Sequence, residues 1–275
     1  MLNELEQALG TLLSDPTRAD IFTFCEAQFV AGGSWQDLVG LYETFGARIG
    51  SDGQADWARL IALLESMAAA LPVEERSQLF EAIGQLWEVR LGRPEQALGH
   101  YQSAFKLWPK GAPESWQAFY ARGIALERIK QYERADKDFR KAISLNDQDA
   151  GLLNYLGYSL IERGVNVQEG RALIEKAYKL RPGDGYIADS LGWAMFLMGE
   201  TEGAVKNLEK AVESTPADPT INEHLGDAYW KIGRRQEAMF QWRRALSLDP
   251  DESQRSGLQK KVAQGLASNE AQKPR

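Results

Sequence analysis

Residues that could perform catalysis or bind a metal are few and widely separated in this sequence of 275 residues. The chain contains one cysteine, Cys25, and two histidines, His100 and His224. A zinc site needs several cysteine, histidine or carboxylate ligands, and acyl transfer needs a nucleophile, an orienting base and an oxyanion donor in one pocket. No such set is recognisable, so we predict no catalytic residue, no metal and no cofactor, and a protein that is not an enzyme.

The isolated candidates have simpler structural explanations. Cys25 lies among three phenylalanines, which predicts a buried and inert thiol. His224 falls within an expected helix, where a polar packing role is favoured over that of a base. Asp184 stands between two glycines before another expected helix, but no strand precedes it and no lysine follows. We therefore expect a turn in which Asp184 caps the helix, and no phosphate site.

Composition and charge exclude two further classes of protein. Hydrophobic residues make up 44% and charged residues 26% of the chain, which is ordinary for a folded protein and excludes wholesale disorder. The net charge of −7 is uneven: residues 1–113 hold 15 acidic and 8 basic residues, and residues 114–275 hold 24 of each. Neither half has the positive charge of a nucleic-acid-binding protein, so we predict no nucleic-acid partner.

The sequence also lacks the pattern of a targeting signal or a membrane span. Residues 1–6 carry two acidic residues and no basic one, unlike a secretory signal. The richest apolar stretch, residues 60–71, is interrupted by Glu65 and Ser66 and is too short to cross a bilayer. We predict no integral membrane segment and a cytoplasmic location, or a periplasmic one if a signal has been removed.

Small residues recur in the C-terminal half at intervals of 34 or 35 residues. The series are Gly123, Gly157, Gly192 and Gly226; then Ala135, Gly170, Ala204 and Ala238; then Ala142, Ala177, Ala211 and Ala245; and the closing residues Asp147, Pro182, Pro216 and Pro250. Each interval predicts two antiparallel helices that approach closely where the glycine lacks a side chain, and proline ends the second helix. Because one helix pair cannot bury its own faces, we predict that the pairs stack.

This pattern resembles the tetratricopeptide repeat (TPR) family: a small residue after leucine in the first helix, as in Leu225-Gly226, alanine at two places in the second, and proline at the end. Residues 154–158 and 241–246 are similar to bacterial TPR proteins of unassigned role. The resemblance implies an all-α fold, an α-solenoid of stacked antiparallel helix hairpins forming a TPR superhelix. We assign five units, at residues 77–111, 116–149, 150–184, 185–218 and 219–252.

The flanking segments are expected to be helical too. Residues 1–76 read as an irregular helical region of degenerate repeats, whose apolar face includes Trp35, Leu38, Tyr42 and Phe45. Residues 110–114 interrupt the repeat register, either as a longer surface loop or as a hinge between two sub-arrays. Residues 253–267 are expected to form a capping helix, and residues 268–275 a disordered tail.

The TPR resemblance also implies a binding surface, because the first helices of TPR units line a concave groove. The corresponding positions here are aromatic, acidic or amide residues: Tyr120, Asn154, Tyr158, Tyr186, Asp189, Trp193, Phe196, Glu223, Asp227 and Trp230. Chaperone-binding TPR modules carry basic and asparagine residues there, and only Asn154 fits that pattern. The resemblance therefore favours a protein partner, either a peptide segment or a helix of apolar and basic character.

We predict a non-enzymatic scaffold or adaptor that binds such a segment in this groove. The alternative is a structural or assembly subunit of a larger complex that contacts partners through its convex surface or its C-terminal basic surface. That basic surface is predicted from Lys231, Arg234, Arg235, Arg243 and Arg244. A further possibility is a regulatory domain of a longer chain that carries catalysis elsewhere.

Overall fold

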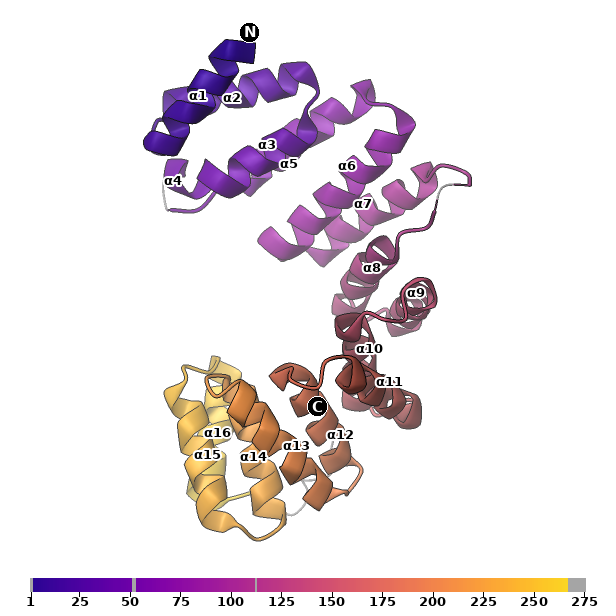
Figure 1. Cartoon of the computed structure of the whole chain (residues 1–275), viewed down its shortest axis with the longest axis vertical. Coiled ribbons are helices and arrows are strands. Elements are labelled where there is room, and N and C mark those ends of the chain that lie inside the picture. The colour runs from indigo at the N-terminus through magenta and orange to yellow at the C-terminus, as the bar shows by residue number, and fades with distance from the viewer. Residues whose placement is uncertain (1, 51–52, 112, 267–275) are drawn as a thin grey trace. The chain divides into compact units, whose positions relative to one another are not determined.

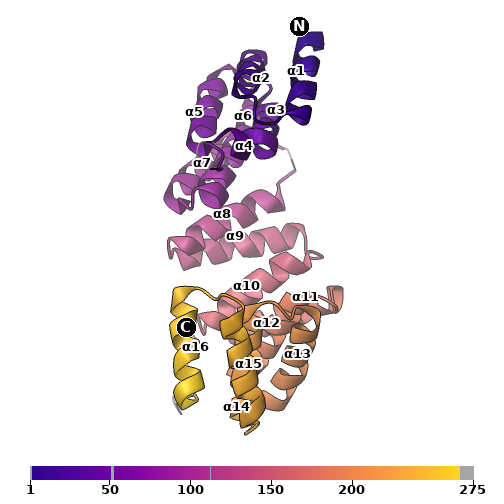
Figure 2. The ribbon, with the colours of Figure 1, turned by 90° about the vertical axis from the view of Figure 1, so that its left-hand side faces the viewer.

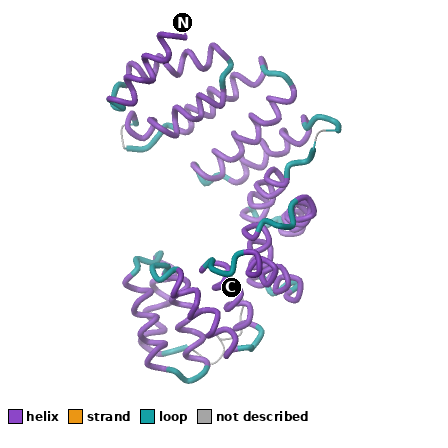
Figure 3. Tube along the Cα trace, in the orientation of Figure 1, coloured by secondary structure: helices purple, strands orange, loops and turns teal. Residues whose placement is uncertain are grey.

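The computed structural model describes residues 2–50, 53–111 and 113–266, and these residues form helices and connecting loops without any strand (Figure 3). The described residues are 79% helical, which confirms the predicted all-α class. The helices group into two compact units, Met1–Lys141 and Ala142–Arg275, and the division falls inside α9 (Tyr132–Leu145). The predicted tail at 268–275, and residue 267 of the predicted capping helix, lie outside the described residues.

The N-terminal unit is built from helices of unequal length (Figure 1). They are α1 (Leu2–Ser14), α2 (Ala19–Gly32), α3 (Trp35–Leu41), α4 (Ala47–Ile49), α5 (Trp57–Met67), α6 (Val73–Gln85), α7 (Pro94–Leu107) and α8 (Trp116–Arg128), with a 3-10 turn at Ala68–Ala70. Two π-helical turns interrupt the series of α-helices, at Tyr42–Gly46 and at Leu86–Arg90. The guanidinium of Arg90, in the second turn, donates a hydrogen bond to Glu43, in the first, at 3.2 Å.

The predicted apolar face of this unit is confirmed, since Trp35, Leu38, Tyr42 and Phe45 are all buried in its core. Cys25 is fully buried beside them, as expected, and burial raises the pKa of its thiol. Residues 110–114 lie in the loop between α7 and α8, where the described residues are exposed. The division between the two units is not in that loop but further along the chain, in α9.

The C-terminal unit is more regular. Its helices are α10 (Ala150–Glu162), α11 (Val167–Leu180), α12 (Gly185–Leu197), α13 (Thr201–Ser214), α14 (Pro219–Lys231), α15 (Arg235–Ser247) and α16 (Glu252–Gln264). They form three hairpins, α10–α11, α12–α13 and α14–α15, and α16 packs beside α15 (Figure 2). The division of residues 77–252 into five repeats stays a prediction.

An aspartate begins the first helix of each hairpin and also α16. Its carboxylate accepts backbone N–H groups of the first turn, which have no partner within the helix. Asp184 accepts from Tyr186 and Ile187 at 3.0 and 3.3 Å, which confirms the predicted cap. Asp149, Asp218 and Asp251 do the same for α10, α14 and α16. These caps fix where each first helix starts, and therefore which side chains it presents on each face.

Glycine sets the distance between the two helices of a hairpin, as predicted. A Cβ atom built on Gly226 would lie 2.5 Å from the indole of Trp242, and one on Gly192 would lie 2.6 Å from Leu208. At Gly157 the clash would be with the carbonyl oxygen of Gly170, at 2.7 Å. Tyr101 over Gly84 and Phe139 over Gly123 repeat the arrangement in the N-terminal unit. A large side chain of the second helix therefore fills the space that the glycine leaves.

We expect Gly226→Ala to destabilise the C-terminal unit, because the new methyl group would overlap the buried Trp242. Overpacking of this kind costs about 1–3 kcal/mol. The matched control is Gly257→Ala in α16, where a Cβ meets nothing within 4 Å and the change to alanine favours helix formation. Denaturant unfolding should give Gly226→Ala a free energy of unfolding lower than that of Gly257→Ala by that amount. Equal free energies would show that the contact at Gly226 leaves room for a methyl group.

Candidate protein-binding site

The first helices of the three C-terminal hairpins, α10, α12 and α14, contact one another in succession. We call the surface that they share the first-helix face. Nine of the ten predicted groove residues lie on these helices: Asn154 and Tyr158 on α10; Tyr186, Asp189, Trp193 and Phe196 on α12; Glu223, Asp227 and Trp230 on α14. The tenth, Tyr120, lies on α8 in the other unit, half-buried, with its ring 5.9 Å from that of Phe139.

Five of these side chains are buried between helices, with exposed fractions below a tenth. They are Asp189, Trp193, Phe196, Glu223 and Asp227. Asn154, Tyr158 and Trp230 are half-buried, and Tyr186 is 59% exposed. The predicted residues are therefore close together, but most of them bind one another or a neighbouring helix. Their role in holding a partner stays a prediction.

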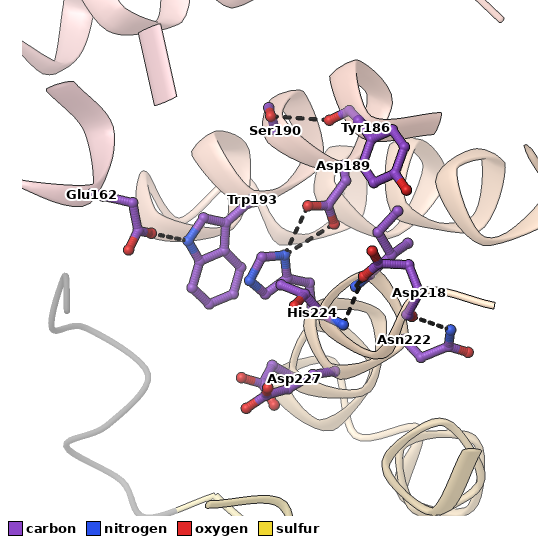
Figure 4. Close-up of polar contacts among 12 residues, drawn as sticks. Glu162, Tyr186, Asp189, Ser190, Trp193, Asp218, Asn222, His224 and Asp227 are labelled. Carbon is purple, nitrogen blue, oxygen red and sulfur yellow. Dashed lines mark hydrogen bonds and ion pairs between the residues drawn. The ribbon is translucent and has the colours of Figure 1, made fainter. Parts of the chain in front are cut away.

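A chain of contacts joins α10, α12 and α14 (Figure 4). The indole N–H of Trp193 donates to Oε1 of Glu162 at 2.6 Å. The imidazole of His224 stacks on that indole, with ring centroids 3.9 Å apart and planes 10° apart. His224 Nδ1 lies 2.9 Å and 3.1 Å from the two carboxylate oxygens of Asp189. Because every member is held by at least one neighbour, the orientation of Trp193 is fixed before any ligand arrives.

The electrostatics of His224 follow from this position. Burial alone would lower its pKa, but the negative charge of Asp189 and the hydrogen bond to it outweigh burial, with help from Glu223 and Asp227. The result is a pKa above the usual value for histidine. The sequence correctly indicated a packing residue, and the structure adds that its Nδ1 is paired with the buried carboxylate of Asp189.

A second buried cluster holds the two acids of α14. Lys261, from α16, donates to Glu223 at 2.6 Å and to the two oxygens of Asp227 at 2.8 and 2.6 Å. The indole N–H of Trp242 also donates to Asp227, and the amide of Gln254 donates to Glu223. Burial raises the pKa of Asp227 in spite of the nearby lysine. Both carboxylates are therefore already satisfied by the chain itself.

In the predicted basic surface, too, some residues are held by internal contacts and others are exposed. Arg234 bonds Glu237 and Glu209, and the guanidinium of Arg235 stacks 3.8 Å from the ring of Trp230. Lys231, Arg243 and Arg244 are exposed, and their side chains form no ion pair within the described part of the chain. Phe240, between these arginines and α14 in sequence, is 65% exposed. Its exposure was not anticipated.

Sequence reasoning did not predict the contacts of Glu162 and Lys261, or the pairing of His224 with Asp189. His224 follows Asp189 by 35 residues and Lys261 follows Asp227 by 34, which is one repeat in each case. Opposite charges at that spacing could have indicated pairing between successive first helices. Trp193 and Glu162 are 31 residues apart, so the same rule would not have found them.

Within residues 2–50, 53–111 and 113–266, no group of three or more histidine, cysteine or carboxylate side chains is placed to hold a metal ion. In the same ranges no helix is long and apolar enough to cross a membrane.

Comparison with known proteins identifies the class. Models of the tetratricopeptide repeat match residues 88–150 and 219–252, and a TPR repeat model matches residues 192–233. A curated relative, the TPR repeat-containing protein PA4667 of Pseudomonas aeruginosa, is 34% identical over 119 residues. That match covers 41% of this chain and 20% of the relative, so the chain spans about a fifth of that protein.

Solved structures share the fold at low sequence identity. Pseudomonas aeruginosa pilF has a TM-score of 0.58 at 20% identity, over 70% of this chain and 84% of that one. The APC/C hetero-tetramer Cut9–Hcn1 gives 0.62 at 14% identity, over 97% of this chain and 52% of that one. YrrB, described as a TPR protein with an unusual peptide-binding site, gives 0.50 at 20% identity, over 74% of this chain and 98% of that one.

The hairpins, the glycine contacts and these matches define a helical-repeat protein. The chain contains tetratricopeptide repeats and has an α-solenoid fold.

We expect His224 to titrate at a higher pH than His100. Burial lowers the pKa of His100, whereas the interaction with Asp189 raises that of His224. Proton NMR of the untagged protein should therefore show His224 protonated to a higher pH than His100. Asp189→Asn keeps the side-chain shape but removes the charge, so it should lower the midpoint of His224 and leave His100 unchanged. An unaffected His224 midpoint would contradict the ion pair.

The same shift has a consequence for stability. A histidine whose pKa is higher in the folded chain than its unfolded value of about 6.5 stabilises the fold fully below that value. This contribution is lost as the pH rises through the raised pKa. The difference in unfolding free energy between the wild type and His224→Gln should therefore shrink with increasing pH. Titration of His100 changes the unfolding free energy with the opposite sign, but equally in both chains, so it cancels in the difference.

Proposed function

We propose that this chain is a non-enzymatic scaffold or adaptor that binds a protein segment along the first-helix face. The TPR fold is a protein–protein interaction scaffold, and TPR proteins bind protein partners. The observation that carries the proposal is the exposed Tyr186 on the same helix as the buried, stacked rings of Trp193 and Phe196, which we call the aromatic floor. Tyr186, Asp189 and Trp193 follow one another at i, i+3 and i+7, so they share one side of α12.

The floor supports binding because it is ordered in advance. The rings of Trp193 and Phe196 stack with centroids 5.0 Å apart and planes 15° apart, and Glu162 and His224 hold the indole in place. A partner that contacts such a surface loses little entropy in ordering it. Aromatic side chains of this kind are frequent anchors at protein interfaces.

Asn154 offers a polar contact on the neighbouring helix. Its Oδ1 is buried and accepts no hydrogen bond from any described residue. An unsatisfied buried acceptor is costly, and an N–H donor from a bound segment would satisfy it once binding has exposed the oxygen. The peptide-binding site named for the YrrB structure, which has the same fold, supports this mode of binding by analogy.

The charge around the face favours a basic partner. The two clusters contain four carboxylates, Glu162, Asp189, Glu223 and Asp227, and two basic side chains, His224 and Lys261. The net charge is negative even with His224 protonated. We therefore propose that the partner segment combines an apolar anchor with lysine or arginine, and that part of its affinity is lost in salt.

Selection of random peptides on the full chain tests this proposal. The selected sequences should combine an aromatic or aliphatic residue with basic ones. Tyr186→Ala should weaken their binding by about 1–3 kcal/mol, the range of interface hot spots. Phe240→Ala is the matched control, because Phe240 is equally exposed but lies on a second helix. Isothermal titration at low and high salt measures both effects, and melting temperatures verify that both variants fold.

The contrary result identifies the second candidate function. Phe240 is exposed beside Arg243 and Arg244, whose guanidinium groups have no ion-pair partner in the described chain. This arrangement favours an acidic partner on the convex side, as expected for a subunit of a larger complex. Peptides that are acidic, that keep their affinity for Tyr186→Ala and lose it for Phe240→Ala would exclude the first-helix face and support this surface.

A further inference from the structure

The last helix of the chain lies against the face where α14 would otherwise be open to a ligand. Leu258 of α16 is fully buried in the core of this unit, and Val262 and Leu266 pack partly against it. Lys261 reaches between Glu223 and Asp227 and gives all its hydrogen bonds to these two carboxylates. The three side chains are 12%, 2% and 7% exposed, so the contact is almost dry.

This slot requires a cation. Glu223 and Asp227 are one helical turn apart on α14, and both are buried. Without Lys261 the two carboxylates would have only His224 as a nearby cation, and His224 already pairs with Asp189. They would then have to take up a proton or recover water, because burial disfavours the ionised form. Trp242 and Gln254 satisfy one oxygen of each acid but carry no charge. Any segment that occupies the slot must therefore bring a lysine or a comparable group.

The resident helix is only lightly attached. Leu258 is its one buried residue in the described chain, whereas α12 and α14 each bury most of their length. Its main anchor is an ion pair, and burying charges costs nearly as much as their attraction returns. The connection to α15 passes through Asp249, which has the left-handed φ of 55° that favours glycine.

We propose that the Glu223–Asp227 slot is a binding site for a lysine-bearing amphipathic helix of a partner protein, and that α16 occupies it until the partner displaces it. The partner helix resembles α16 in chemistry: a leucine, a lysine three residues later, and apolar residues four and eight positions after the leucine. The inference rests on the proposed function in assuming that partners dock on the first-helix side of the unit. It adds a specific slot, the class of helix that binds there, and a helix of the chain itself that competes for the slot.

A synthetic peptide of residues 252–266 is the probe, used with the full-length chain. In the wild type the attached α16 competes at a high effective concentration, so the labelled peptide should bind weakly. Lys261→Met in the chain removes the competing cation, and the peptide should then bind at least tenfold more tightly. The matched control is Lys260→Met, which changes an exposed neighbour and should leave the wild-type affinity. A peptide in which methionine replaces Lys261 should lose the gain.

Equal affinity of the peptide for Lys261→Met and Lys260→Met would overturn the proposal. Hydrogen exchange of the wild type provides a test that needs no variant: amides of α16 should exchange through a local opening, well before those of α14. Exchange of α16 only together with α14 and α15 would make it a permanent cap and equally overturn the proposal. A wild-type dimer that forms with rising concentration, seen by light scattering, would do so too, because a second copy would then be the occupant.

The outcome is independent of the first-helix anchors. Tyr186→Ala should leave the affinity of the 252–266 peptide unchanged, since Tyr186 belongs to α12 and makes no contact with the slot among those described. If the proposed first-helix site is wrong, the selected peptides will bind Tyr186→Ala as tightly as the wild type. If the proposed slot is wrong, the 252–266 peptide will bind Lys261→Met no more tightly than Lys260→Met. The two failures can therefore be told apart.

Discussion

The close approach of two helices at a glycine is the constraint on which the rest of this structure depends. Gly157, Gly192 and Gly226 let the second helix come so near that even a methyl group would overlap it. That distance buries a large side chain of the second helix, such as Leu208 or Trp242, against the first. Because the contact repeats at nearly constant intervals, the first helices are brought into contact in succession. The aspartate caps then fix which residues they present to one another.

Charges buried between successive first helices select the register of that stack. Asp189 meets His224 on the next hairpin, and Asp227 meets Lys261 on the last helix. Buried ion pairs contribute little net free energy compared with apolar contacts, but a mismatched neighbour would leave a carboxylate unpaired in a dry environment. We interpret these pairs as a device that penalises wrong stacking. These pairs also explain why the acidic residues predicted to line a groove are already occupied by internal contacts.

The sequence predicted the fold well because its signals are local or strictly periodic. Glycine spacing, the Asp184 cap and the apolar face of Trp35 and Leu38 depend on neighbours within a few turns or on one repeat length, and the structure confirms them. The availability of Asp189, Glu223 and Asp227 could not be judged in the same way. Their exposure depends on partners in the next helix, and Lys261 belongs to a segment outside the repeat pattern. The π-helical turns at Tyr42–Gly46 and Leu86–Arg90 left no recognisable mark in the sequence.

The local and periodic signals that specify the fold have different consequences for function from the contacts between successive helices. A fold that is specified by small residues and caps leaves its surface free to vary, which is why TPR proteins share an architecture without sharing partners. In this chain most of the predicted groove residues are committed to internal contacts. Under the proposed function, recognition would depend on exposed groups such as Tyr186, and on whether an internal contact can be exchanged for an external one. An interaction scaffold built this way gains specificity from its own structure, because a competing segment must reproduce both the apolar contacts and the charge that it replaces.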